Sequence, residues 1–300
     1  MAAAIILEGL TKYYGSTLGI EDLDLEVHEG EIFGFLGPNG AGKSTTISAI
    51  LDFIRPTSGT ATVLGLDSRR DVVAIHRLVG YLPGELAMYG RMTGRELLGY
   101  LASLRNVNAK AEIASLVARL DLDLDRKIHT YSSGNRQKLG LVQAFMHRPR
   151  LLILDEPTGG LDPIVQREFY SLLDEAKAEG RTVFLSSHIL PEVERITDRA
   201  AIIRKGQLMV VAEINELKQQ AQRRVEFTFA EPVEPEVFLS LSTVREVDVV
   251  ARTVMVTFAG SVDPVLKLAA RYEVETIVSH DGDLESAFLA YYHEGDGDAA

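Results

Sequence analysis

The sequence contains no cysteine, no long apolar run and no paired metal-binding histidines. Without cysteine the chain forms neither a disulfide nor a thiolate metal site, which is typical of proteins in a reducing compartment. Its 7 histidines are scattered and show no H-E-x-x-H pattern, so we expect no zinc site. No stretch approaches the roughly 18 apolar residues that a membrane-spanning helix needs.

Positive charge is also scarce. The chain has 31 lysines and arginines against 43 aspartates and glutamates, which gives a formal net charge of -12. A nucleic-acid binder needs clustered basic side chains to meet the phosphates, so we expect no nucleic-acid partner. The opening residues carry no basic leader and no small-residue cleavage site, which argues against a signal peptide. We therefore expect a cytoplasmic chain that a partner must hold if it acts at a membrane.

The 300 residues, 46% of them apolar, can bury a large core, and we expect one large and one small domain. Residues 1–215 alternate short apolar runs with amphipathic stretches, which predicts an α/β domain. The strands that we expect are Ile5–Glu8, Leu23–Val27, Ile32–Leu36, Thr62–Leu64, Val79–Leu82, Leu151–Leu154, Thr182–Ser186 and Ala200–Ile203.

Two other regions have a different pattern of apolar residues and predicted elements. Residues 94–147 carry apolar positions at helical spacing, which predicts a helical subdomain at about 85–148. Residues 216–293 read as β-α-β-β-α-β-α, an order that suits a ferredoxin-like α+β module, although irregular decoration of the main domain is the alternative. We expect residues 294–300, EGDGDAA, to be a disordered tail.

A glycine-rich segment, GPNGAGKST, follows the apolar run IFGFL. It fits the phosphate-loop pattern G-x-x-x-x-G-K-[ST], in which glycines let successive N–H groups curl around phosphate oxygens. A helix that starts near Lys43 would aim its positive end at the same place, while Lys43 reaches the phosphates and Ser44 ligates Mg²⁺. The pattern predicts nucleotide binding by Gly37, Pro38, Asn39, Gly40, Ala41, Gly42, Lys43, Ser44 and Thr45.

A second segment, LLILDEPT, reads as a buried strand with two carboxylates at its end. In open α/β sheets ligands bind at the carboxyl ends of the strands, so these acids are placed to act on a nucleotide. We expect Asp155 to hold Mg²⁺ and Glu156 to orient or polarise the attacking water.

Four motifs, GPNGAGKST, YSSGNRQKLGL, LLILDEPTGGLDP and LSSHIL, occur in this order. The ordered set resembles the nucleotide-binding subunit of an ATP-binding cassette (ABC) transporter, and the resemblance covers residues 4–215. It implies a P-loop NTPase core of the cassette type with a helical insert, and an ATPase that uses ATP and Mg²⁺. The YSSGN segment, residues 131–135, is similar to the family's signature loop, which acts on ATP held by a second subunit; Ser132 and Gly134 would touch its γ-phosphate, with Ser133 in the same loop.

The resemblance implies three further roles. Tyr14 matches the aromatic residue that stacks on adenine, although Tyr13 or a plain strand-end aromatic is the alternative. Asp162 matches the aspartate that links the two nucleotide sites across the dimer. His188 matches the histidine that contacts the γ-phosphate and completes the catalytic pair with Glu156.

Two departures from the family pattern stand out. Gly84 occupies the position of a glutamine that normally helps to bind Mg²⁺, so either Glu85 replaces it or the metal keeps an extra water. The signature loop has Ser133 and Asn135 where glycine and glutamine are commoner. Because both changes keep small polar groups, we expect phosphate contact to survive.

The resemblance therefore implies an ATPase subunit that pairs head to tail with a second copy and drives a separate integral-membrane permease at the inner face of the cell membrane. The residues of these motifs are most similar to those of the drug- and antibiotic-efflux exporter branch. The expected docking surface is residues 79–92, where Leu86, Met88 and Tyr89 are either exposed for this contact or buried under the helical insert. The alternatives are a soluble cassette ATPase of DNA repair or translation, and a nucleotide-sensing regulator that does not hydrolyse ATP.

Overall fold

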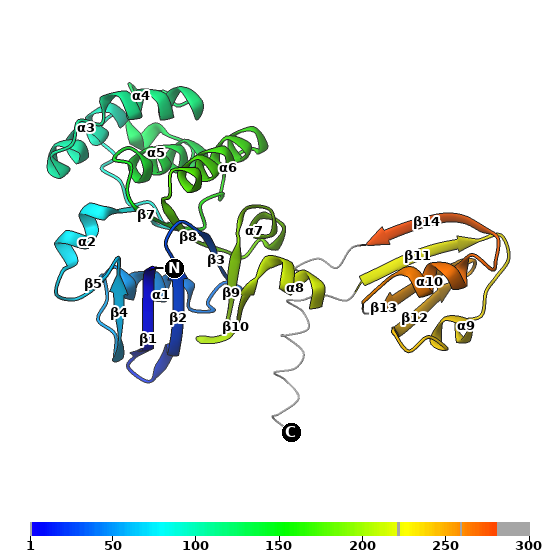
Figure 1. Ribbon diagram of the computed structural model, residues 1–300. Coiled ribbons are helices and arrows are strands. Elements are labelled where there is room, and N and C mark those ends of the chain that lie inside the picture. Colours follow the sequence, from blue (N-terminus) through cyan, green and yellow to red (C-terminus); the bar gives the residue numbers. More distant parts are fainter. Residues whose placement is uncertain (1, 221–222, 259, 281–300) are drawn as a thin grey trace. The chain divides into compact units, whose positions relative to one another are not determined.

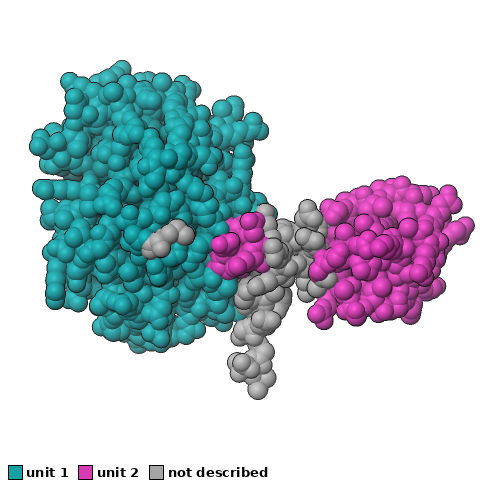
Figure 2. All heavy atoms as spheres, viewed as in Figure 1, with its two compact units in different colours: residues 1–211 teal, residues 212–300 magenta. Residues whose placement is uncertain are grey.

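The structure is a computed structural model that describes residues 2–220, 223–258 and 260–280. The chain divides into two compact units, residues 1–211 and residues 212–300 (Figure 2). The first unit contains two sheets and the second contains one, and each unit has its own hydrophobic core.

A six-stranded sheet forms the centre of the first unit. Its strand order is β10 (Gln207–Glu213), β9 (Arg199–Arg204), β3 (Ile32–Leu36), β8 (Thr182–Ser187), β7 (Leu151–Asp155) and β6 (Val79–Leu82). From β9 to β6 each neighbouring pair is parallel. Every residue of β3, β7 and β8 is buried, as expected for parallel strands that are covered on both faces. The carboxyl ends of these three adjacent strands therefore meet at one edge.

A second sheet packs against the same core. It has four antiparallel strands in the order β2 (Thr17–His28), β1 (Ala3–Tyr14), β4 (Ser58–Val63) and β5 (Leu66–Asp67). Residues of this sheet such as Ile5, of the central sheet such as Phe33, and of helix α1 (Lys43–Ile50) such as Ile47 belong to one buried cluster. This shared core fixes α1 at the end of the loop that follows β3.

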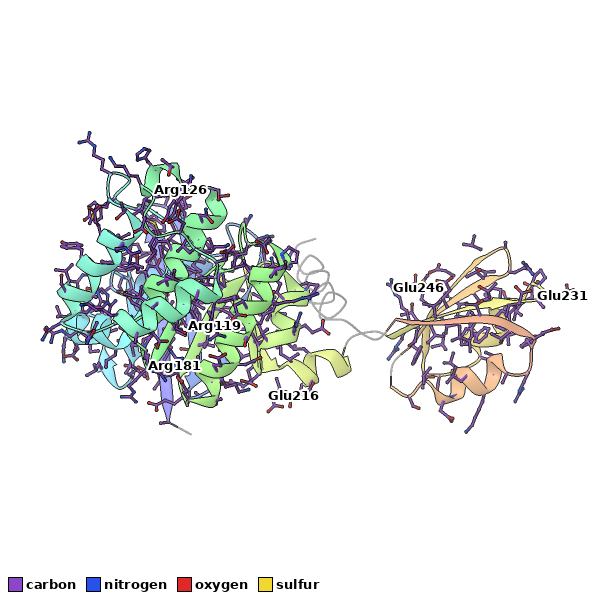
Figure 3. All side chains as sticks on the ribbon, turned by 90° about the horizontal axis from the view of Figure 1, so that it is seen from above. Arg119, Arg126, Arg181, Glu216, Glu231 and Glu246 are labelled. Atoms are coloured by element: carbon purple, nitrogen blue, oxygen red, sulfur yellow. The ribbon has the colours of Figure 1, made fainter. Side chains whose placement is uncertain are left out.

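Helices fill the chain between β6 and β7. They are α3 (Gly94–Arg105), α4 (Lys110–Arg119) and α5 (Ser133–Phe145), which lie together in Figure 1, with a 3-10 turn at Ile128–Thr130. A capping box formed by Thr93 and Glu96 begins α3. Arg119, labelled in Figure 3, donates to Glu168 and to Glu175 of α6 (Pro163–Ala178) and so fastens α4 to α6.

Shorter helices complete the first unit. Helix α2 (Val72–Leu78) precedes β6, and α7 (Leu190–Ile196) follows β8. Among the described residues, no helix has both the length and the apolar character that crossing a lipid bilayer requires.

The second unit contains one antiparallel sheet in the order β12 (Val244–Val250), β13 (Thr253–Phe258), β11 (Arg223–Phe229) and β14 (Val274–His280). Along the chain its elements follow α8 (Ile214–Gln220) as β11, α9 (Glu236–Leu239), β12, β13, α10 (Asp263–Ala269) and β14 (Figure 1). Phe227 of β11 stacks on Phe238 of α9 at 5.9 Å, and Val265 of α10 joins the same buried core. Alternate residues of β11 and β13 thus face the helices.

The expected elements and the observed ones differ mostly in their ends. The bounds expected for β3 and β6 are those of the structure, whereas β1, β2 and β4 are longer than the sequence pattern predicts. Strands β5 and β10 are absent from the prediction because their burial is only partial. The helix expected at LESAFLAYY and the tail at 294–300 lie outside the described residues.

Candidate functional site

Three loops meet at the carboxyl edge of the central sheet. The phosphate loop follows β3, Glu156 follows β7 and His188 follows β8. In the parallel register Leu36 pairs with Ser187, and Asp155 pairs with Ser186. The sheet therefore brings the phosphate loop together with both carboxylates and the histidine, which lie more than a hundred residues further along the sequence.

The phosphate loop has the backbone that its glycines predict. Gly42 has a φ of 114°, and a Cβ there would lie 2.7 Å from the Ile20 side chain and 2.9 Å from the Gly19 carbonyl oxygen. Gly42 also precedes α1 without giving it a side-chain cap, so the first N–H groups of this helix face the loop and form an anion site. Only glycine has both the conformation and the size for this position.

Lys43 is almost completely buried beneath the loop. Its Nζ donates to the carbonyl oxygens of Gly37 at 2.7 Å and Pro38 at 3.2 Å, and it lies 3.1 Å from Oε1 of Glu156. These contacts hold the ammonium group under the curved backbone. A phosphate bound in the loop can therefore replace Glu156 as the partner of Lys43 without a large movement of the lysine.

The Asp155 carboxylate is held at both oxygens. Ser44 Oγ donates to Oδ2 at 2.7 Å, and Ser186 Oγ donates to Oδ1. A hydroxyl oxygen beside a carboxylate oxygen is the kind of donor set that Mg²⁺ takes when phosphates and water supply its remaining ligands. The side chains of Ser44 and Asp155 thus fit a magnesium ion.

Glu156 lies between the lysine and the histidine. Its Oε2 is 2.7 Å from Nδ1 of His188, and its N–H donates to the Ser186 carbonyl oxygen at 3.2 Å. The residue has a φ of 50°, a left-handed conformation that is unfavourable for a residue with a side chain and is common at functional sites. The backbone thus points the carboxylate into the space above the phosphate loop.

A cavity of about 310 Å³ opens at this place. It is lined by Tyr14, Leu18, Gly19, Asn39, Gly40, Gly42, Lys43, Ser44, Thr45 and Glu156. Tyr14 is 49% exposed, whereas Tyr13 donates its hydroxyl to Glu21 at 2.8 Å and does not line the cavity. Of the two tyrosines, only Tyr14 is thus available to stack on a ligand in the cavity.

Gly84, which occupies the position of the family's glutamine, lies directly against Asp155. A Cβ at Gly84 would be 3.2 Å from Asp155 Oδ2, so the absent side chain leaves room beside the oxygen that Ser44 contacts. Glu85 is exposed and is not among the residues that line the cavity. Burial, and then the charge of Asp155, raise the pKa of nearby Tyr81 to about 12, which keeps its hydroxyl protonated.

The signature loop does not join the cavity of its own chain. Ser132 caps α5 by accepting from the Asn135 N–H at 3.2 Å, and both Ser132 and Ser133 are exposed. Asp162 caps α6 in the same way, and the N–H of Val165 lowers the pKa of its carboxyl group. None of Ser132, Ser133, Gly134 and Asp162 lines the cavity.

Sequence reasoning missed Ser186, which holds both Asp155 and the Glu156 backbone. The sequence gives only a weak indication of this role, because a serine at the end of a buried strand has many structural uses. Glu192 also lies near Glu156, where it accepts from Thr158 Oγ1 at 2.7 Å. Burial, with the nearby Glu156 charge, raises the pKa of Glu192.

Comparison with known proteins agrees with this geometry. The family model for the ABC transporter matches residues 20–159. The bacitracin transport ATP-binding protein BcrA of Bacillus licheniformis is 37% identical over 234 residues, 77% of this chain and 76% of that protein. The linearmycin resistance ATP-binding protein LnrL of Bacillus subtilis is 35% identical over 216 residues, 70% of this chain and 69% of that protein.

Solved structures have the same fold. An ATP-binding subunit of an ABC transporter superposes with a TM-score of 0.66 at 29% identity, covering 72% of this chain and 92% of that one. A bacterial ABC transporter cassette, MJ0796, solved as a dimer, gives a TM-score of 0.64 at 20% identity and covers 70% of this chain and 98% of that one.

The fold and the phosphate-loop site together define a P-loop ATPase of the cassette class. Because relatives more than 30% identical match over more than two thirds of their length, the chain belongs to the ABC transporter family, as an ATP-binding subunit that hydrolyses ATP. The resemblance drawn from the four ordered motifs is thereby confirmed.

Proposed function

We propose that this subunit couples ATP hydrolysis to export through a separate integral-membrane permease, and that it acts as a head-to-tail pair with a second copy of itself. The observation that supports the pairing is that the cavity and the signature loop are separate in one chain. The cavity is lined by the phosphate loop and Glu156 of one chain, with Asp155 hydrogen-bonded to Ser44 of that loop, while the signature loop of the same chain is exposed and lies outside the cavity. A second copy can therefore bring the signature loop that each cavity lacks.

The residues of the site have separate tasks in this proposal. The N–H groups of the phosphate loop and Lys43 bind the phosphates, and Tyr14 stacks on the adenine. Mg²⁺ held by Ser44 and Asp155 would neutralise charge on the phosphate oxygens. Glu156 accepts a proton from the attacking water, and His188, 2.7 Å away, holds the carboxylate and contacts the γ-phosphate.

The second copy completes each site. Its Ser132, Ser133 and Gly134, at the start of α5, would meet the γ-phosphate with hydroxyl and backbone N–H donors. Asp162, at the start of α6, would link the two nucleotide sites. ATP binding closes the pair because the phosphate charge is then shared by two helix starts, and hydrolysis opens it.

We place the permease contact on residues 79–92 and the chain at the inner face of the cell membrane. Tyr89 is 64% exposed and suits such a contact, whereas Leu86 is half-buried and lies close to Gly140 of α5. Leu86 therefore links the contact surface to the helix of the signature loop. Export is supported by the relatives named for bacitracin transport and linearmycin resistance.

The domain assignment belongs to the same proposal. Residues 1–215 form the cassette, with a helical subdomain at about 85–148 that is supported by α3, α4 and α5. Residues 216–293 form a ferredoxin-like accessory module, which is supported by its β-α-β-β-α-β order and the strand order β12-β13-β11-β14.

Co-expression with the neighbouring gene product tests the function. We expect the full-length chain to co-purify with a protein of several membrane spans. Tyr89→Ala should weaken that association without changing ATP turnover of the isolated subunit, because Tyr89 lies outside the nucleotide cavity. Recovery of a water-soluble partner alone would favour a cassette ATPase of DNA repair or translation.

The replacement of the family's glutamine by Gly84 gives a second test, which concerns the Mg²⁺ site. We expect Glu85→Ala to leave the Mg²⁺ dependence of ATP turnover unchanged, because Glu85 is exposed and Gly84 leaves space for a metal-bound water beside Asp155. A Mg²⁺ titration of turnover measures this, with Glu112→Ala as a control on α4. A several-fold rise in the Mg²⁺ concentration needed for half-maximal turnover in Glu85→Ala alone would show that Glu85 has replaced the glutamine.

A further inference from the structure

A buried glutamine connects the helix of the signature loop to the backbone of Glu156. Gln137, in the second turn of α5, is only 7% exposed. Its Nε2 donates to the carbonyl oxygen of Pro157 at 2.8 Å and lies 3.4 Å from that of Glu156. These two carbonyl groups belong to the loop that follows β7, so the amide group holds a loop and not its own helix.

The loop needs such support because Glu156 has its left-handed backbone conformation. On the N–H side, Ser186 accepts the Glu156 N–H through its carbonyl oxygen and its Oγ, each at 3.2 Å. On the C=O side, the partners are the Gly159 N–H at 3.3 Å and Gln137. The direction of the Glu156 carboxylate follows from this backbone, so Gln137 helps to set it.

The same helix contacts the loop at a second point. A Cβ at Gly134 would lie 2.7 Å from the carbonyl oxygen of Gly160, a distance that only glycine permits. Gly134 is in the signature loop and Gln137 is three residues further along α5. Less than one helical turn thus separates Gly134, which is proposed to meet a phosphate, from the amide that holds Glu156.

We propose that Gln137 is a positioning residue that couples the signature loop of a chain to the Glu156 carboxylate of the same chain. When the loop engages ATP held by the second copy, α5 moves as a rigid element, and Gln137 carries that movement to the Glu156 backbone. Each copy then sets its own catalytic carboxylate according to whether the opposite site is filled. The inference rests on the proposed roles of Glu156 and of the signature loop.

The test is Gln137→Met in the full-length chain, which keeps the size of the side chain and removes the donor. We expect kcat to fall roughly three- to tenfold, the effect of one lost hydrogen bond. The affinity for ATP should change little, and the Hill coefficient for ATP should fall toward one. Gln137→Glu should lower kcat further, because a carboxylate would face two carbonyl oxygens.

Gln143→Met is the matched control, since it makes the same change in α5 at a residue that lines a small cavity with Phe53 and Tyr81. We expect it to leave kcat and the Hill coefficient unchanged. If Gln137→Met and Gln143→Met lower the melting temperature and kcat by equal amounts, the role of Gln137 is structural and the proposal is overturned.

A double variant separates this inference from the proposed role of Glu156. If Gln137 acts through Glu156, adding Gln137→Met to Glu156→Gln causes no further loss of turnover. Fully multiplicative losses would overturn the coupling while leaving Glu156 catalytic. Full turnover of Glu156→Gln alone would instead overturn the role of Glu156 and, with it, this inference.

Discussion

Glu156→Gln is expected to lower ATP turnover by roughly 10²–10⁴-fold, the range for a positioned group that transfers a proton. The amide keeps the shape of the side chain but cannot accept a proton from water. ATP binding should persist, because the phosphate loop and Lys43 are unchanged. Since ATP then stays uncleaved between two copies, a stable ATP-dependent dimer should accumulate, which size-exclusion chromatography and a phosphate-release assay measure.

Glu192→Gln is the control for this variant, because it also replaces a carboxylate by an amide near His188. Thr158 can still donate to the new amide oxygen, so we expect the fold and most of the turnover to remain. Turnover of Glu156→Gln at the level of the unaltered chain would show that Glu156 does not receive the proton.

Lys43→Met is expected to raise the dissociation constant for ATP about 10²-fold or more. Lys43 can form two charge-assisted hydrogen bonds with the phosphates, each worth about 1.5–3 kcal/mol, and methionine forms neither. The variant also leaves Glu156 without its ion-pair partner at 3.1 Å. Calorimetric titration with ATP measures the affinity, and circular dichroism checks that the chain is folded.

Lys177→Met provides the comparison for Lys43. Lys177 of α6 forms an ion pair with Asp198 at 2.5 Å, and neither residue lines the nucleotide cavity. Its loss should cost little stability and leave ATP affinity unchanged, because exposed ion pairs contribute about 0–1 kcal/mol. Equal affinities of the two variants for ATP would remove Lys43 from the binding site.

Much of the candidate site could be predicted because its chemistry is local. The phosphate loop needs glycines, a lysine and a hydroxyl within nine positions, and Asp155 needs only the end of a buried strand. The register of β7 and β8 could not be predicted, because strand pairing joins residues far apart in the sequence. Ser186, 31 residues from Asp155, is a partner only because β8 lies between β3 and β7.

The choice between neighbouring residues also needed the structure. Tyr13 and Tyr14 are equivalent as sequence, but alternate residues of a strand point to opposite faces, and only Tyr14 lines the cavity. Likewise, the space that Gly84 leaves beside Asp155 depends on the loop that follows β6, next to β7 in the sheet.

The sequence by itself identified the family and the ATPase activity, and it predicted which residues bind phosphate and which acidic residues act beside them. The tertiary structure alone decided which side chains hold those residues, that Glu156 has a left-handed backbone, and that Gln137 reaches it from the helix of the signature loop. The physical reason is the separation in sequence of the residues that interact. A turn or a helix start is specified by a few neighbouring residues, whereas the lateral order of strands and the contacts between loops arise from packing over the whole core.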